Sequence, residues 1–173
     1  YFKLQSFIFM PVFGLNNGVT PIIAYNYGAQ NRERVVSAIR HVVTYAVIVM
    51  LLGLAAFQLL PRQLLLMFDA SETMLALGIP ALRIISLSFV LASFGVAASG
   101  AFQALGKSIY SMYVSVARQL VVLLPAAFLL AQTGRVELVW WAFPIAELVS
   151  FAMSVIFMVH INRKIISKIG KKS

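Results

Sequence analysis

Three long intervals of this chain, residues 4–31, 41–61 and 84–106, contain no Lys, Arg, Asp or Glu. Each supplies the ~20 apolar residues, at a rise of ~1.5 Å per residue, that cross a ~30 Å hydrocarbon core as a helix. Two further apolar segments, 110–132 and 138–160, are each interrupted by a single charge. Runs of this length are too long for barrel strands, whereas a helix satisfies its own backbone hydrogen bonds in lipid. The sequence therefore predicts an all-α, polytopic membrane helix bundle.

The composition agrees with a bundle of this kind. The chain has 173 residues, of which 61% are hydrophobic and 11% charged, whereas a soluble domain is about a quarter charged. Five transmembrane helices are expected at about 2–26, 41–60, 77–104, 110–132 and 138–160, followed by a basic tail over 161–173. The 61–76 loop is apolar in its first half, which predicts an interfacial helix lying flat on the membrane, with Ser71 capping the next helix.

The distribution of basic residues predicts the orientation. With the loops numbered alternately, one side of the membrane collects Arg62 and Arg135, alongside three acids. The other side collects Arg32, Arg34, Arg40, Lys107, Arg163, Lys164, Lys168, Lys171 and Lys172. Lys and Arg accumulate on the cytoplasmic side, so we expect a multi-pass protein of the cell membrane with a cytoplasmic carboxy terminus. The net charge of +9 comes from short clusters between apolar runs; it fits lipid headgroups and predicts no nucleic-acid partner.

The first predicted helix contains two prolines and two glycines, which are Pro11, Gly14, Gly18 and Pro21. The prolines predict bends near residues 7–11 and 17–21, and the glycines predict a face that a neighbouring helix approaches closely. Asn16 and Asn17 should avoid lipid and face other helices or a wet cavity. Two interpretations stay open: a bent packing helix, or a helix that moves and lines a pathway.

The same helix ends in the motif YNYGAQNRER, which is typical of an exit from the membrane. Tyr25 and Tyr27 suit the headgroup layer, where one end of the ring is apolar and the other is wet. Asn26 and Gly28 are expected to end the helix, with Gly28 as its left-handed residue. The arginines that follow then meet anionic lipid.

Three charges, Arg83, Arg118 and Glu147, fall within the predicted spans. At the bilayer centre each costs at least about 2.5–3.5 kcal/mol on insertion scales, so we expect an intramembrane charge network. Arg118 and Glu147 lie near the middle of adjacent antiparallel spans, which predicts an ion pair or a shared polar network between them. Arg83 lies nearer the outer edge and can snorkel. The pair either locks two helices together, or Glu147 is a protonatable or cation-binding group.

Four segments in register resemble the MATE (multidrug and toxic compound extrusion) family. They are FMPVFGLNNGVTPIIAYNYGAQNRERV, LLLMFDASETMLALGIPALRI, SGAFQALGKSIYSMYVSVARQLVVLLPAAFLLA and VWWAFPIAELVSFAMSVIFM, which together extend over residues 9–158. The likeness is greatest to the bacterial multidrug exporters. It implies that residues 1–173 form helices 8–12 of a twelve-helix, two-lobe antiporter, as a partial carboxy-terminal lobe.

The resemblance also implies a function. Such a protein would export amphipathic or cationic drugs by alternating access, coupled to sodium or protons. The partners implied are the lipid bilayer, these small molecules and a missing amino-terminal lobe. The coupling ion would bind mainly outside this fragment, because span three has no Asp or Glu; no other cofactor is implied. Gln5, Asn17 and Gln103 are candidates for lining the drug pathway.

Other classes of protein fit the same residues less well. An enzyme is not expected, because the chain has no cysteine and no recognisable catalytic or metal-binding motif, and His41 and His160 both sit at span ends. A lipid-linked saccharide flippase of the same superfamily would share the bundle but should place several basic residues in its cavity. A non-transporting membrane scaffold would need no bent helix bearing asparagines.

Overall fold

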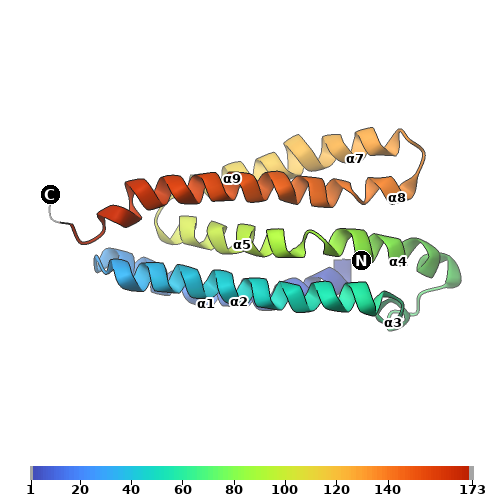
Figure 1. Cartoon of the computed structure of the whole chain (residues 1–173), viewed down its shortest axis with the longest axis horizontal. Coiled ribbons are helices and arrows are strands. Elements are labelled where there is room, and N and C mark those ends of the chain that lie inside the picture. Colours follow the sequence, from blue (N-terminus) through green and yellow to red (C-terminus); the bar gives the residue numbers. More distant parts are fainter. Residues whose placement is uncertain (1, 172–173) are drawn as a thin grey trace.

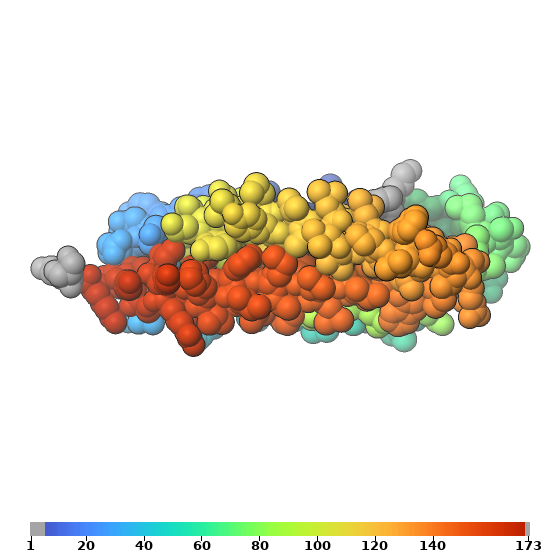
Figure 2. All heavy atoms as spheres, turned by 90° about the horizontal axis from the view of Figure 1, so that it is seen from above, coloured from blue at the N-terminus to red at the C-terminus, as the bar shows by residue number. Residues whose placement is uncertain are grey.

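The computed structural model describes the backbone of residues 2–171 and the side chains of residues 6–171, so the candidate Gln5 lies outside the described side chains. This part of the chain is helical and contains no strand. Its long helices run side by side along the length of an elongated bundle (Figures 1 and 2). The all-α bundle predicted from the sequence is confirmed.

The described elements follow one another in this order. The first half of the chain contains α1 (Phe2–Gly28), α2 (Arg32–Leu59), the short α3 (Pro61–Leu66), α4 (Glu72–Ser86) and α5 (Phe89–Ala104). The second half contains α6 (Ser108–Val116), the π-helical η1 (Ala117–Leu123), α7 (Leu124–Ala131), α8 (Val136–Val139), α9 (Ala142–Lys164) and the 3-10 turn η2 (Ile166–Lys168).

Within the described residues, four stretches are long and apolar enough to cross a membrane, and α4 with α5 makes a fifth if the bent pair counts as one span. The four are Ser6–Gly28, Arg32–Leu59, Ser108–Ala131 and Val136–Lys168. The number of spans agrees with the sequence prediction. α2 begins earlier than predicted, because Asn31 caps it: the Asn31 side chain accepts a hydrogen bond from the Arg34 amide at 3.3 Å.

The bundle has two chemically different ends. One end holds the α1–α2 turn, the α5–α6 turn and the carboxy-terminal segment (Figure 1). We call it the basic end, because it carries the Lys and Arg clusters described above. The opposite end holds α3, which Figure 1 shows nearly end-on and therefore across the bundle, as predicted for the 61–76 loop. Ser71 caps α4 as predicted, accepting from the Met74 amide at 3.3 Å.

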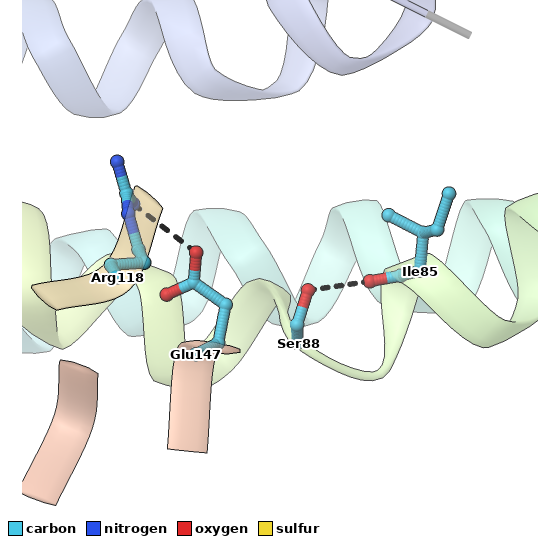
Figure 3. Close-up of polar contacts among 4 residues, drawn as sticks. All are labelled: Ile85, Ser88, Arg118 and Glu147. Carbon is cyan, nitrogen blue, oxygen red and sulfur yellow. Dashed lines mark hydrogen bonds and ion pairs between the residues drawn. The ribbon is translucent and has the colours of Figure 1, made fainter. Parts of the chain in front are cut away.

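The third span is broken, which the sequence did not predict. α4 and α5 meet at an angle of 52° across Leu87 and Ser88. The Ser88 hydroxyl donates to the Ile85 carbonyl at 2.7 Å (Figure 3), and the Ser86 hydroxyl donates to the Arg83 carbonyl at 2.9 Å. Serine hydroxyls that bond to carbonyls of their own helix add hydrogen bonds at the break, which supports such a bend within a membrane.

The fourth span contains a second irregularity. Its middle, Ala117–Leu123, is π-helical, and Pro125 follows at the start of α7. Proline has no amide hydrogen and its ring clashes with the carbonyl four residues earlier, so the preceding turn widens. Arg118 lies in this widened turn, which therefore sets the direction of its side chain.

Two apolar clusters hold the bundle together. One joins α1, α2, α4 and α5 away from the basic end and includes Phe57 and Phe89, whose ring centroids lie 5.0 Å apart. The other lies at the basic end and joins Ile23 of α1 and Val35 of α2 to Phe102 of α5 and Ile161 of α9. α9 runs beside both η1 and α5. Figure 2 shows α9 beside η1.

The packing face predicted at Gly14 and Gly18 of α1 has no close neighbour within the described residues, so it stays a prediction. Nothing lies within 4 Å of a side chain built at Gly14 or at Gly18. The close approaches occur at other glycines: Gly53 meets Ile8, and Gly100 of α5 meets the side chain of Asn16. The small residues that let helices approach are thus on the partner helices of α1. α1 itself continues through Pro11 and Pro21, and the bends expected there remain predictions.

The predicted end of α1 is confirmed, but the residue predicted to be left-handed is wrong. The helix ends at Gly28, but the left-handed residue is Gln30, with φ of 55°. The Gln30 amide donates to the Tyr27 carbonyl at 3.1 Å and the Asn31 amide donates to the Asn26 carbonyl at 2.9 Å, which is a Schellman ending. The Gln30 side chain also donates to the Tyr27 carbonyl at 3.2 Å and so holds this conformation.

Candidate functional site

A polar cavity of about 670 Å³ lies between α1, α5, α6, η1 and α9. This volume is within the ~300–1,000 Å³ typical of small-molecule sites. Apolar side chains of α1, among them Phe9, Met10 and Phe13, form part of its wall. Its polar lining includes Arg118 and Glu147 together with Asn16, Asn17, Ser99, Gln103, Ser115 and Ser150.

The charged centre of the cavity is the ion pair that the sequence predicts. Arg118 Nη1 donates to Glu147 Oε1 at 3.1 Å, and the two side chains are 31% and 15% exposed. Figure 3 shows both side chains directed past α5 toward the space below α1. It is the only ion pair among the described residues. Because η1 carries the arginine and α9 the glutamate, the pair joins the fourth and fifth spans.

The carboxylate of Glu147 is only half used. Its second oxygen, Oε2, is buried and has no hydrogen-bond partner, and the hydroxyl of Ser154 on the same helix is in the same state. Residues 147, 150 and 154 recur at helical spacing, so they lie along one face of α9. Ser150 and Ser154 face Gly95 of α5. A buried acceptor without a partner costs about 1–3 kcal/mol, so the site retains capacity for a donor or a cation.

The α1 wall supplies amide groups. Asn17 is exposed and lines the cavity, while Asn16 packs against Gly100. The Asn16 carbonyl accepts a hydrogen bond from the Thr20 hydroxyl at 2.7 Å. Both asparagines thus turn toward other helices and the cavity, as their polarity predicts. Gln103 of α5 joins them in the lining.

Arg83 does not belong to this group. Its side chain is exposed and makes no ion pair within the described residues. The predicted three-residue charge network is therefore a pair, and Arg83 contributes only its backbone carbonyl, which accepts from Gln58 Nε2 at 2.7 Å. The reason is position: α4 is separated by the 52° bend from α5, which faces the cavity.

Several lining residues were missed from the sequence. Ser99, Ser115 and Ser150 are single short hydroxyl residues within apolar spans, and a serine there usually bonds to its own helix backbone. A signal did exist for one of them, because Ser150 and Ser154 repeat the helical face of Glu147. The described residues contain no group of three or more side chains suited to a metal ion.

The arrangement has a definite chemical character. A guanidinium, a carboxylate, amides and hydroxyls line one cavity whose remaining walls are apolar, and the second oxygen of the carboxylate is buried beside it without a partner. An ammonium or a small cation matches the free carboxylate oxygen, and hydrogen-bond acceptors match the unused donors of the guanidinium. An amphipathic molecule carrying a charged group fits such a lining.

A comparison with models of protein families identifies the family of this chain. The family model described as MatE matches residues 1–129, well over half of the chain. This chain belongs to the MatE family.

The MatE chain is also similar to two proteins described as multidrug export protein MepA. It is 25% identical to that of Staphylococcus haemolyticus (strain JCSC1435) over 169 residues, covering 96% of this chain and 37% of the relative. It is 24% identical to that of Staphylococcus aureus (strain bovine RF122 / ET3-1), covering 94% of this chain and 35% of the relative.

A solved structure supports the same fold. The MATE multidrug transporter DinF-BH, whose structure was solved in complex with a ligand, superposes on the MatE chain with a TM-score of 0.85 at 30% identity. The match covers 92% of this chain and 36% of DinF-BH. The MatE chain thus spans between a third and two fifths of the length of these relatives.

Proposed function

We propose that this chain is part of a secondary active transporter that exports drugs across the cell membrane. The observation that carries the proposal is the polar cavity with its Arg118–Glu147 pair in the middle of a MatE-family helix bundle. A charged pair inside a membrane protein usually marks a substrate or ion pathway. The relatives described as multidrug export proteins support the same substrate class.

The proposed mechanism assigns roles to the residues of the cavity. The apolar wall of α1 binds the hydrophobic body of an amphipathic drug, and the negative charge of Glu147 attracts its cationic group. Asn17 and Gln103 hold its polar substituents. The guanidinium of Arg118 keeps the carboxylate in place and prevents it from turning into the helix contacts behind it.

The transport cycle needs more than these residues. Alternating access requires two units that rock around a site between them. We propose that residues 1–173 form helices 8–12 of such a protein, within its carboxy-terminal lobe. The coupling ion, sodium or a proton, is proposed to bind mainly in the other lobe, because α5 and the second half of α4 contain no Asp or Glu.

The orientation is part of the proposal. The basic end carries most of the Lys and Arg residues, while Asp69, Glu72 and Glu137 lie toward the opposite end. The positive-inside rule then places the basic end and the carboxy terminus in the cytoplasm. Cysteine labelling from outside intact cells, with single cysteines at Ser71 and at Ser167, tests it: only Ser71→Cys should react.

Dye efflux from proteoliposomes tests the function. A full-length parent protein containing residues 1–173 should export a cationic dye when an ion gradient is applied, and the 173-residue chain alone should not. In the parent, Glu147→Gln should lower efflux of cationic dyes, with Glu137→Gln as the control for loss of an exposed acid. Efflux by the isolated chain would overturn the two-lobe proposal. Unchanged efflux in Glu147→Gln, with only lower expression, would remove Glu147 from the pathway.

A further inference from the structure

The carboxy-terminal segment is docked on the bundle. Ile161, Ile166 and Ile169 are buried in the apolar cluster at the basic end, against residues of α1, α2 and α5. The Gly170 amide donates to Gln30 Oε1 at 3.1 Å, which ties the segment to the α1–α2 turn across 140 residues of sequence. Figure 2 shows the end of this segment beside the α1–α2 turn. Its lysines therefore have fixed neighbours.

The docked segment and the end of α1 border an open hollow of about 200 Å³. It is lined by Tyr27, Gln30, Lys164, Ile165, Lys168 and Ile169. Two lysines, a glutamine and a tyrosine thus line one small space, together with two isoleucines. Neither lysine belongs to the cavity of the Arg118–Glu147 pair, so the drug-export proposal gives this hollow no role.

The positive charge of this hollow has no partner within the described residues. Lys164 and Lys168 are exposed, and neither makes an ion pair there. Of the five acids in the chain, only Glu33 lies at the basic end, and it is not in the lining. Two like charges in one small space repel each other. The carboxy-terminal dipole of α9 attracts cations, but it does not require both to line the same hollow.

We propose that this hollow binds the phosphate-bearing headgroup of an anionic membrane lipid. The two lysines would contact the phosphate, and the amide of Gln30 and the hydroxyl of Tyr27 would contact the polar remainder of the headgroup. A phosphodiester carries one negative charge, which separates and partly neutralises the two ammonium groups. Charge-assisted hydrogen bonds to phosphate are among the stronger polar contacts.

The position of the hollow favours a lipid over a free phosphate ion. It lies where the membrane-spanning helices α1 and α9 end. A lipid whose acyl chains lie along these helices would have its headgroup at the level of the lysines, as for basic residues that flank membrane helices.

Native mass spectrometry of the full 173-residue chain in detergent tests the proposal. The chain is mixed with equal amounts of phosphatidylglycerol and phosphatidylcholine that have the same acyl chains, and the bound lipids are counted. We expect a clear preference for phosphatidylglycerol. Replacing both lysines, in Lys164→Gln/Lys168→Gln, should weaken that preference about 25-fold, since each basic residue near a membrane surface contributes about fivefold.

Two variants of the same chain separate a site from general attraction. Arg32→Gln/Arg34→Gln removes the same charge from the same end, outside the lining, and should keep the preference. Lys164→Arg/Lys168→Arg should keep it as well. Equal losses in the lysine and arginine pairs, or no preference in the original chain, would overturn the proposal. Full displacement of phosphatidylglycerol by inorganic phosphate, but not by chloride of equal ionic strength, would show that the hollow takes free phosphate and would overturn the assignment to lipid.

Discussion

Removing either partner of the Arg118–Glu147 pair should lower the free energy of unfolding. The two single losses should add up to more than the loss caused by removing both partners together. Glu147→Gln keeps the shape of the side chain and deletes its charge, which leaves the guanidinium of Arg118 without a counter-charge inside the membrane. Arg118→Gln does the reverse and leaves a carboxylate whose Oε2 is already buried without a partner. The double variant contains neither charge and therefore neither uncompensated group.

The magnitude follows from how far each group is buried. Losing one partner of a fully buried pair costs about 3–5 kcal/mol of unfolding free energy. Arg118 is 31% exposed to a polar cavity, so we expect about 2 kcal/mol for Glu147→Gln, after allowing for screening. Glu147 is only 15% exposed, so we expect about 3 kcal/mol for Arg118→Gln. The double variant should lose about 3 kcal/mol rather than about 5 kcal/mol, a coupling energy of about 2 kcal/mol.

The assay is a double-mutant cycle on the purified chain. Unfolding is driven by SDS in mixed micelles and followed by the loss of helical signal in far-UV circular dichroism. Glu137→Gln is the control, because it removes an exposed acid and should change the free energy of unfolding by less than about 0.5 kcal/mol. If the two single effects add within about 0.5 kcal/mol, the pair does not stabilise the bundle and the reasoning is wrong.

Two further predictions concern helix contacts and use the same unfolding assay. Gly100→Val should cost about 1–3 kcal/mol, because its side chain would meet that of Asn16; Gly14→Val, built into open space, should cost far less, and equal losses would contradict the assigned contact. Gln58→Leu should cost about 0.6–1.7 kcal/mol, the range for hydrogen bonds between membrane helices, because it removes a donor to the Arg83 carbonyl at the break in the third span. An unchanged midpoint for Gln58→Leu would mean that the break needs no support from α2.

The fold was accessible from the sequence because its strongest signal is length. Five apolar stretches of span length, separated by charged or polar turns, leave little choice in lipid, where helices satisfy their own backbone groups. The register of charges was equally informative: Arg118 and Glu147 lie at matching depths in antiparallel spans, and the pair forms. Both inferences use only the position of a residue along the axis of a straight helix.

The parts that were not predicted depend on rotation and irregularity. The break at Leu87 and Ser88 has no proline or glycine to mark it, and the serines that support it resemble any others in the chain. Arg83 was grouped with the charge pair because depth alone cannot tell which way a helix faces. The close approach of Asn16 to Gly100 was not predicted, since a small residue shows that close approach is permitted, and the facing side chain decides where it occurs.

The bend between α4 and α5 has a consequence for bilayer thickness. Together the two segments hold 15 and 16 residues, roughly 46 Å of helix at ~1.5 Å per residue, against a hydrocarbon layer of about 30 Å. A straight segment of that length accommodates the mismatch by tilting as a whole, which shifts every contact along it. A segment jointed near its centre shortens its projection by changing one angle, so α5 can keep its register against α1, α2 and α9 while α4 follows the membrane surface.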